Sequence, residues 1–80
     1  MQYQKKALYR INDEVQMDVI EHNHQGQEVQ VAKHFFIHNR QYITESNKWV
    51  YQLNEEENGQ AGAPWRQHRW VAERPLSPVL

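Results

Sequence analysis

The 80-residue chain contains no cysteine, which excludes a disulfide-stabilised scaffold and any metal site built on thiolates. No apolar run approaches the ~20 residues that a membrane span requires, so we expect no membrane partner. Residues 1–6 also lack the apolar stretch of a signal peptide. These absences together indicate an intracellular protein, either cytoplasmic or nuclear.

The sequence also lacks the signatures of an enzyme. Its three glycines, Gly26, Gly59 and Gly62, stand in turn contexts and form no phosphate-binding loop. No serine lies in a nucleophile-elbow motif, and the acidic run Glu55–Glu57 is typical of a solvated loop. We therefore expect no enzymatic activity, no catalytic residue and no cofactor. A formal net charge of −1 does not indicate general affinity for nucleic acid either.

Alternation of apolar and polar side chains predicts β-strands, because the side-chain period of an extended chain is two. The clearest strand is Lys48–Leu53, and we expect it to form a hairpin with a last strand, Arg66–Glu73. Val15–Glu21 and Glu28–Ala32 should form another hairpin, the first along the chain, across a polar loop that contains a glycine.

The segment 28–38 leaves two alternatives open. Phe35 and Ile37 alternate as in a strand, whereas other apolar residues of the segment can be placed at helical spacing. Abundant β-branched and aromatic residues, and the lack of an N-cap, favour the strand. A tight turn at Asn39–Arg40 should then lead to a short strand, Gln41–Thr44.

Several short strands separated by turn signals predict an all-β fold. We expect a single domain, a small and partly open barrel of about five or six strands, with flexible or irregular ends at 1–6 and 74–80. A chain of this size buries only ~60% of its unfolded surface, so large side chains must fill much of the core. The expected core residues are Val15, Met17, Val19, Val29, Val31, Ile43, Trp49, Tyr51, Leu53 and Val71.

Three short motifs carry a family resemblance. Asn12–Val15 follows an apolar pair, Lys48–Leu53 is aromatic and alternating, and Asn58–Gly59 precedes Arg69–Leu76. They resemble the opening motif, central strand and closing hairpin of small Src-homology-three-like β-barrels (the KOW, Tudor and chromo-barrel group, and integrase C-terminal domains), with Asn12 where glycine is usual. The resemblance spans residues 8–76 and implies a fold type more than an activity, because such folds carry many unrelated functions.

Rings and cations alternate in the hexapeptide Trp65–Trp70. On a strand, Arg66, His68 and Trp70 would share one face, and Trp65 and Arg69 the other. Arginine can bridge phosphates while an aromatic ring stacks on a base, so this segment suggests a nucleic-acid-binding module. In the other interpretation, one tryptophan belongs to the core and the arginines flank it through cation–π contacts.

The two phenylalanines, three tryptophans and four tyrosines are too many to bury fully in so small a domain. Some should line a surface groove or an oligomer interface, where tyrosine and tryptophan are favoured. We therefore expect a non-catalytic interaction module that binds a protein or peptide through an aromatic-rich surface, with nucleic-acid binding as the alternative. A homodimer would cover an aromatic face left open within the chain. The expected binding residues are Trp65, Arg66, His68, Arg69, Trp70, Phe36 and Tyr42.

Four histidines form two pairs at strand spacing, His22 with His24 and His34 with His38. Neutral imidazoles bind zinc or copper, and each pair would project to one face of a strand. However, no HExxH motif, thiolate or suitably placed carboxylate accompanies either pair. We therefore predict no metal site and expect these histidines to be solvent-facing or edge polar residues, with a histidine metal site as a third and weaker functional alternative.

Overall fold

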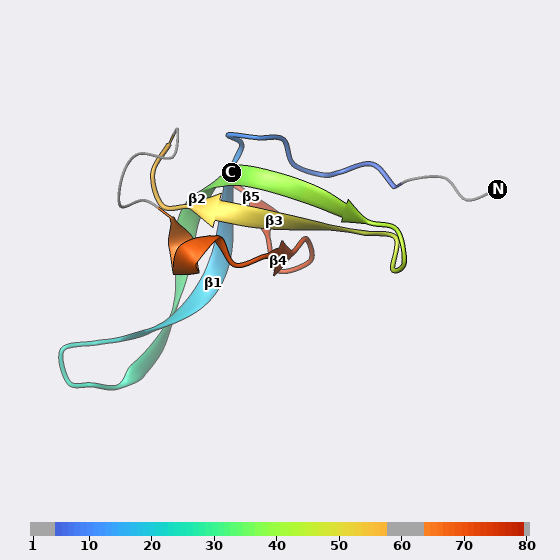
Figure 1. The fold of residues 1–80 in the computed structure, drawn as a ribbon. Coiled ribbons are helices and arrows are strands. Elements are labelled where there is room, and N and C mark those ends of the chain that lie inside the picture. Colours follow the sequence, from blue (N-terminus) through green and yellow to red (C-terminus); the bar gives the residue numbers. More distant parts are fainter. Residues whose placement is uncertain (1–4, 58–63, 80) are drawn as a thin grey trace.

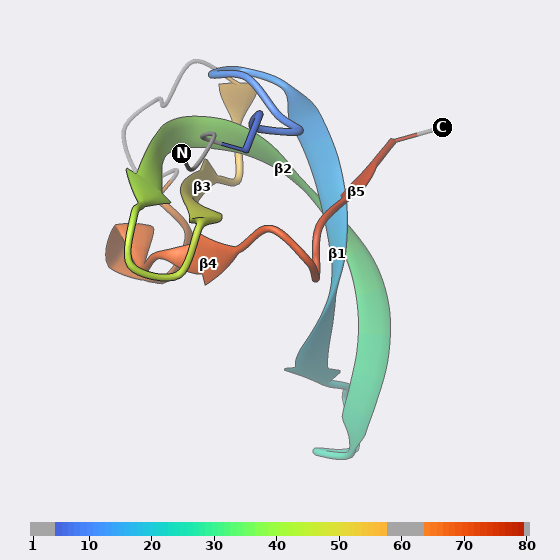
Figure 2. The same ribbon diagram turned by 90° about the vertical axis from the view of Figure 1, so that its right-hand side faces the viewer.

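The computed structural model describes residues 5–57 and 64–79, and in these ranges the chain is built from antiparallel strands (Figure 1). The strand order is β4-β3-β2-β1-β5, and the sheet curves into a half-barrel (Figure 2). This confirms the all-β class and the partly open, five-stranded form. The strands are β1 (Glu14–His22), β2 (Glu28–Ile43), β3 (Lys48–Asn54), β4 (Val71–Ala72) and β5 (Ser77–Pro78).

Strands β1 and β2 form the predicted first hairpin, in a register that places Val15 opposite Phe35. Its turn is stabilised by the side chain of Asn23, whose Oδ1 accepts backbone N–H bonds from Gln25 (2.9 Å) and Gln27 (3.0 Å). Gly26 has φ +77°, a conformation that glycine adopts without steric cost. The outer half of the hairpin projects away from the half-barrel (Figures 1 and 2).

Strand β2 settles the ambiguity of 28–38 in favour of a strand, but the predicted turn at Asn39–Arg40 is wrong. The strand continues through it to Ile43, so Gln41–Thr44 does not begin a separate strand. A register shift between Ile37 and Asn39 inserts His38 as an extra residue, and pairing with β3 continues on both sides of this bulge. The chain reverses only at 44–47, in the polar turn that leads into β3.

The predicted last strand, Arg66–Glu73, is also wrong, because only Val71–Ala72 pairs with β3. Trp65–His68 forms a tight turn instead, and Arg66, Gln67 and His68 all have positive φ, between 47° and 60°. In a strand, residues 65 and 68 would face opposite sides of the sheet. The turn directs both side chains onto β2, where the Trp65 ring meets Phe35 and the His68 ring meets His38.

The core lies inside the curve of the sheet. Five expected core residues are buried, three (Ile43, Trp49 and Val71) are half-buried, and Val29 and Val31 are exposed because they lie on the projecting part of the hairpin. Sequence analysis missed four buried residues that complete the core. The buried apolar residues are Tyr9, Val15, Met17, Val19, Phe35, Ile37, Tyr51, Leu53 and Leu76.

The C-terminal segment closes one side of the half-barrel. Within 74–79, where we expected an irregular end, β5 pairs with Val15 and Gln16 of β1. Leu76 is buried, and its carbonyl accepts a hydrogen bond from the Tyr9 hydroxyl (3.0 Å). The first and last described segments are therefore tied to each other as well as to the sheet.

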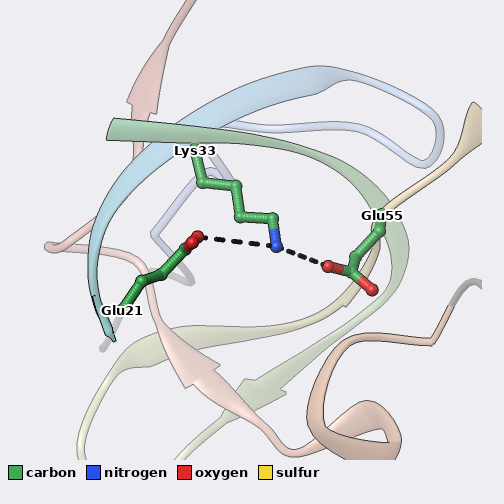
Figure 3. Close-up of polar contacts among 3 residues, drawn as sticks. All are labelled: Glu21, Lys33 and Glu55. Carbon is green, nitrogen blue, oxygen red and sulfur yellow. Dashed lines mark ion pairs between the residues drawn. The ribbon is translucent and has the colours of Figure 1, made fainter. Parts of the chain in front are cut away.

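Lys33 connects the hairpin to the chain that leaves β3 (Figure 3). Its Nζ lies 2.7 Å from Oε1 of Glu55 and 3.8 Å from Oε1 of Glu21. The hydrogen bond to Glu55 raises the pKa of Lys33. All three side chains remain more than a third exposed, so solvent screening limits their contribution to stability to ~1 kcal/mol or less.

Candidate functional site

A surface groove of about 640 Å³ lies beside Trp49, near the start of β3. Three separate parts of the chain form its walls: the segment that contains Lys5 and Leu8, the hairpin from Ile43 at the end of β2 to Val50 in β3, and the segment from Ala72 to Arg74. Its volume falls within the ~300–1,000 Å³ typical of ligand sites. We take this groove, called here the Trp49 groove, as the candidate binding site.

Contacts on several sides fix the Trp49 ring. The indole Nε1–H donates a hydrogen bond to the carbonyl of Lys5 (2.6 Å). The Tyr42 ring stands opposite in the sheet, with its centroid 5.5 Å from that of Trp49. The guanidinium of Arg40 lies 5.3 Å from the centroid of the Trp49 ring, a cation–π contact. A half-buried indole held in this way offers a fixed apolar surface to a ligand.

Glu73 takes part in the internal structure of the groove. Its Oε2 accepts hydrogen bonds from the Tyr51 hydroxyl (2.5 Å) and from the backbone N–H of Leu8 (3.0 Å). Burial, and then the bond to Glu73, raises the pKa of Tyr51 well above its ordinary value, so the phenol stays protonated as a donor. This carboxylate therefore joins the N-terminal segment to β3.

The rim of the groove is cationic. Lys5, Lys48 and Arg74 line it, and Glu73 is the only acidic residue among the described lining residues. Glu73 already accepts two hydrogen bonds, from Tyr51 and from Leu8. The three cations are therefore the charged groups that the groove presents to a ligand. Leu8, which is 67% exposed, adds apolar surface to one wall. The arrangement suits a ligand that combines an apolar side chain with negative charge.

A second polar cluster joins the Trp65–His68 turn to the sheet. The rings of His38 and His68 stack, and Asn54, which is 3% exposed, contacts both. Asn54 Oδ1 lies 2.7 Å from His68 Nε2, and Asn54 Nδ2 lies 3.3 Å from His38 Nδ1. Burial lowers the pKa of His68, and His38 lowers it further. The hydrogen bonds and ring contacts of this cluster include no carboxylate and no nucleophile.

The structure does not gather the predicted binding residues into one site. The Trp65 ring packs edge-to-face against Phe35 (centroids 5.1 Å apart), and the guanidinium of Arg66 lies 4.8 Å from its centroid. For Trp65, the core and cation–π interpretation is therefore the better description. Arg69 and Trp70 are exposed.

The other predicted binding residues lie apart from that segment. Phe36 is half-buried and stands opposite Asn54 in the sheet. His68 belongs to the histidine stack described above. Tyr42 alone contacts the Trp49 ring beside the groove. The predicted aromatic surface is thus divided between the turn and the groove.

The histidine pairs are likewise separated. His34 lies 3.1 Å from Glu14 through its Nδ1, whereas His38 contacts Asn54 and His68. His22 and His24 lie at the exposed end of the hairpin. In residues 5–57 and 64–79, no group of three or more His, Cys, Asp or Glu side chains is arranged to hold a metal ion.

Sequence analysis assigned Trp49 to the core and did not select the charged residues around it. One feature of the sequence could have indicated that Trp49 is only partly buried. It lies at the start of a strand, beside Lys48 and a polar turn, and side chains at strand ends are often incompletely covered. Lys5 and Arg74 gave no such signal, because they come from opposite ends of the chain and meet Trp49 only in the folded structure.

Comparison with known proteins gives no assignment: no family model, no curated protein and no solved structure matches this chain. In the two described ranges there is no helix long and apolar enough to cross a membrane.

Proposed function

We propose that this chain is a non-catalytic interaction module that binds an extended peptide or protein segment in the Trp49 groove. The observation that carries the proposal is the fixed, half-buried indole of Trp49 beside a groove with a cationic rim. Binding sites of this kind combine an aromatic anchor with a few placed polar groups. The ring is pre-positioned, so little side-chain entropy is lost on binding.

The charges of the groove indicate the class of ligand. Lys5, Lys48 and Arg74 would pair with carboxylates, and Trp49 would contact an aromatic or aliphatic side chain between them. The ligand is therefore an acidic peptide that carries at least one large apolar residue.

We also propose that the half-barrel is of the Src-homology-three-like type. The strand order β4-β3-β2-β1-β5 supports this assignment, as does the tight connection between β4 and β5, in which the Leu76 N–H donates to the carbonyl of Glu73 (3.1 Å). Asn12, which stands where the family motif has glycine, has φ 73°, a conformation that favours glycine or asparagine. The fold type supports a binding role without selecting the ligand.

Nucleic-acid binding by the Trp65–Trp70 segment is the alternative. Arg66 and Arg69 are exposed, and Trp70 is 40% exposed. The Trp65 ring, however, is occupied by Phe35 and Arg66, which removes one of the two rings that base stacking would use. The geometry therefore favours the peptide.

A synthetic peptide with one phenylalanine flanked by aspartates tests the proposal. We expect its addition to isotope-labelled protein to shift the indole N–H signal of Trp49 and the amide signals of Ser46 and Ala72, all in the groove. Arg74→Glu should weaken binding roughly tenfold through charge reversal at the rim. Arg69→Glu is the matched control outside the groove, and it should leave peptide affinity unchanged.

A single-stranded oligonucleotide titrated in parallel distinguishes the two functions. Phosphate contacts would shift the Trp70 region, weaken steeply with salt and depend on Arg69 instead of Arg74. Oligonucleotide binding with that pattern, and no peptide-induced shift at Trp49, would reject the peptide proposal.

A further inference from the structure

The outer edge of β1 is unpaired over most of its length. Strand β5 pairs only with Val15 and Gln16, so the edge from Met17 to His22 has no neighbouring strand among the described residues. This part of the hairpin is only two strands wide, and an isolated two-stranded hairpin is marginally stable in water. Ile20, at the middle of this edge, is 54% exposed.

The hydrogen-bond pattern identifies the backbone groups that this edge presents. The Asn23 N–H donates to the carbonyl of Gln27 (3.0 Å), and the Ile37 N–H donates to that of Asp13 (3.0 Å). Hydrogen-bonded and non-hydrogen-bonded pairs alternate along an antiparallel ladder. The odd-numbered residues of β1 therefore point their backbone groups toward β2, and Asp18, Ile20 and His22 point theirs outward.

We propose that β1 edges of two copies of this chain pair antiparallel about a two-fold axis at Ile20, which joins the two sheets into one. In this register Ile20 faces its own copy, and Asp18 faces His22 of the partner copy on the same side of the sheet. Each outward N–H and carbonyl from 18 to 22 then gains a partner. The two Ile20 side chains come together between two pairs of complementary polar groups.

Charge and space select this register over its neighbours. A two-fold axis at residue 18 or 21 would place two aspartates or two glutamates opposite each other, which is destabilising. An axis at residue 19 would place His22 of the second copy against Gln16, where β5 already lies. Beside Asp18, a hollow of about 360 Å³, lined also by Pro75 and Ser77, leaves space for the second copy's His22.

The opposite edge of the hairpin is less available. Strand β3 pairs with β2 only from Phe36 onward, so the edge of β2 before that residue is also without a strand. The chain that leaves β3 nevertheless begins beside this edge, because Glu55 directly follows Asn54, the partner of Phe36, and its carboxylate binds Lys33 at 2.7 Å (Figure 3). A second copy is therefore assigned to the β1 edge.

Two proline variants form a matched test, because Ile20 and Gln30 face each other across the hairpin in a non-hydrogen-bonded pair. Proline at either position removes an outward N–H and keeps the ladder between β1 and β2, on the β1 edge in Ile20→Pro and on the β2 edge in Gln30→Pro. Gln30→Pro also removes the hydrogen bond from Gln30 Nε2 to Asp18 Oδ2 (2.8 Å), which leaves the Asp18 carboxylate free for the second copy's His22. In sedimentation experiments over a concentration series, we expect the natural sequence and Gln30→Pro to dimerise. Ile20→Pro should raise the dimer dissociation constant roughly tenfold or more, because two symmetry-related hydrogen bonds are lost.

Both proline variants could lose the dimer because proline distorts the hairpin. A second test therefore exchanges the charges of the proposed cross-copy pair. Asp18→Lys should break the dimer, and adding His22→Asp should restore it by rebuilding both cross-copy pairs. Amide exchange adds a second readout, since the Ile20 N–H should be protected at high concentration and lose protection on dilution. A monomer at millimolar concentration, a dimer that survives Ile20→Pro, or failure of the charge exchange to restore pairing would each overturn the proposal.

Discussion

The imidazole rings of His38 and His68 lie face to face, with centroids 4.0 Å apart and planes 4° from parallel. One ring comes from the bulge in β2 and the other from the Trp65–His68 turn, which begins eleven residues after β3 ends at Asn54. The Asn54 amide contacts both rings. Because Asn54 Nδ2 can only donate, His38 Nδ1 must accept, and protonation of that nitrogen would remove the bond. The stack therefore holds the turn to the sheet while both rings are neutral.

Acidification should destabilise the protein through His68. Its pKa in the folded state is lowered, first by burial and then by His38, whereas in the unfolded chain it is about 6.5. The unfolded chain therefore binds the proton first, and the stability present above pH ~6.5 is lost as the pH falls through the folded-state pKa. Urea unfolding on both sides of this range should give a lower free energy on the acid side.

Two variants isolate this effect. His68→Gln should reduce the acid dependence of the unfolding free energy, because the group whose pKa differs between the two states is gone. His24→Gln, in the exposed turn of the hairpin, should keep the dependence of the natural sequence. Equal acid dependence in all three proteins would contradict the role given to the stack.

Tyr51→Phe should cost about 1.5–3 kcal/mol, because it removes a hydrogen bond to the charged Glu73 carboxylate. The same substitution should change behaviour at alkaline pH. Burial and Glu73 raise the pKa of Tyr51 in the folded state, so only the unfolded chain ionises as the pH rises past about 10, and stability falls.

Thermal unfolding across the alkaline range measures this loss, which should be smaller in Tyr51→Phe than in the natural sequence. Tyr9 contributes in the same direction, since burial and Glu73 also raise its pKa. Tyr42→Phe is the control, because the Tyr42 hydroxyl makes its hydrogen bond at the exposed surface, with the Asn47 side chain. An alkaline profile that Tyr51→Phe leaves unchanged would be inconsistent with the Glu73 contact.

The adjacent phenylalanines should respond very differently to truncation. Phe35 is fully buried and meets Trp65, so Phe35→Ala should cost ~3–5 kcal/mol, enough to unfold a large fraction of a domain this small. Phe36 lies half-buried on the other face, and its truncation should cost roughly 1–2 kcal/mol. Chemical denaturation of both variants gives the comparison, and similar losses would argue against the observed register of β2.

Asn12 should be sensitive to backbone conformation more than to side-chain chemistry. Its φ of 73° is left-handed, and its N–H donates to the carbonyl of Ile37 (2.8 Å) just before β1. Asn12→Gly should be neutral or slightly stabilising, whereas Asn12→Val should cost ~1–2 kcal/mol through steric strain. Melting temperatures rank the three proteins, and a valine variant as stable as the glycine variant would refute the conformational argument.

The hairpin of β1 and β2 and the strand β3 were predictable because period-two alternation acts locally. Val15, Met17 and Val19 face the core as their alternation indicates. Val29 and Val31 follow the same alternation, yet they are 38% and 39% exposed, because they lie toward the outer end of the hairpin, away from the half-barrel. The alternation of side chains predicts which face of the sheet a residue lies on, but it does not predict whether another part of the chain covers that face.

The candidate site was predictable only in small part. Tyr42 was selected only because the chain has more aromatic residues than so small a core can bury, and it does lie against Trp49. The left-handed turn was not predictable, because Arg66 and Gln67 have no preference for positive φ, and the turn forms where Trp65 and His68 find partners on β2. Lys5 and Arg74 reach the groove only in the folded chain, where the Lys5 carbonyl accepts from Trp49 and β4, just before Arg74, pairs with β3.

The sequence by itself determined the all-β class, the first hairpin, the central strand and the exclusion of thiolate chemistry, since these follow from composition and from contacts between near neighbours. The tertiary structure decided the bulge at His38, the turn that replaces the last strand, the burial of Leu76 and the assembly of the Trp49 groove. Each of these features depends on contacts between residues distant in sequence, such as Tyr9 with Leu76 and Lys5 with Trp49. Such contacts override the local structural preferences of the chain.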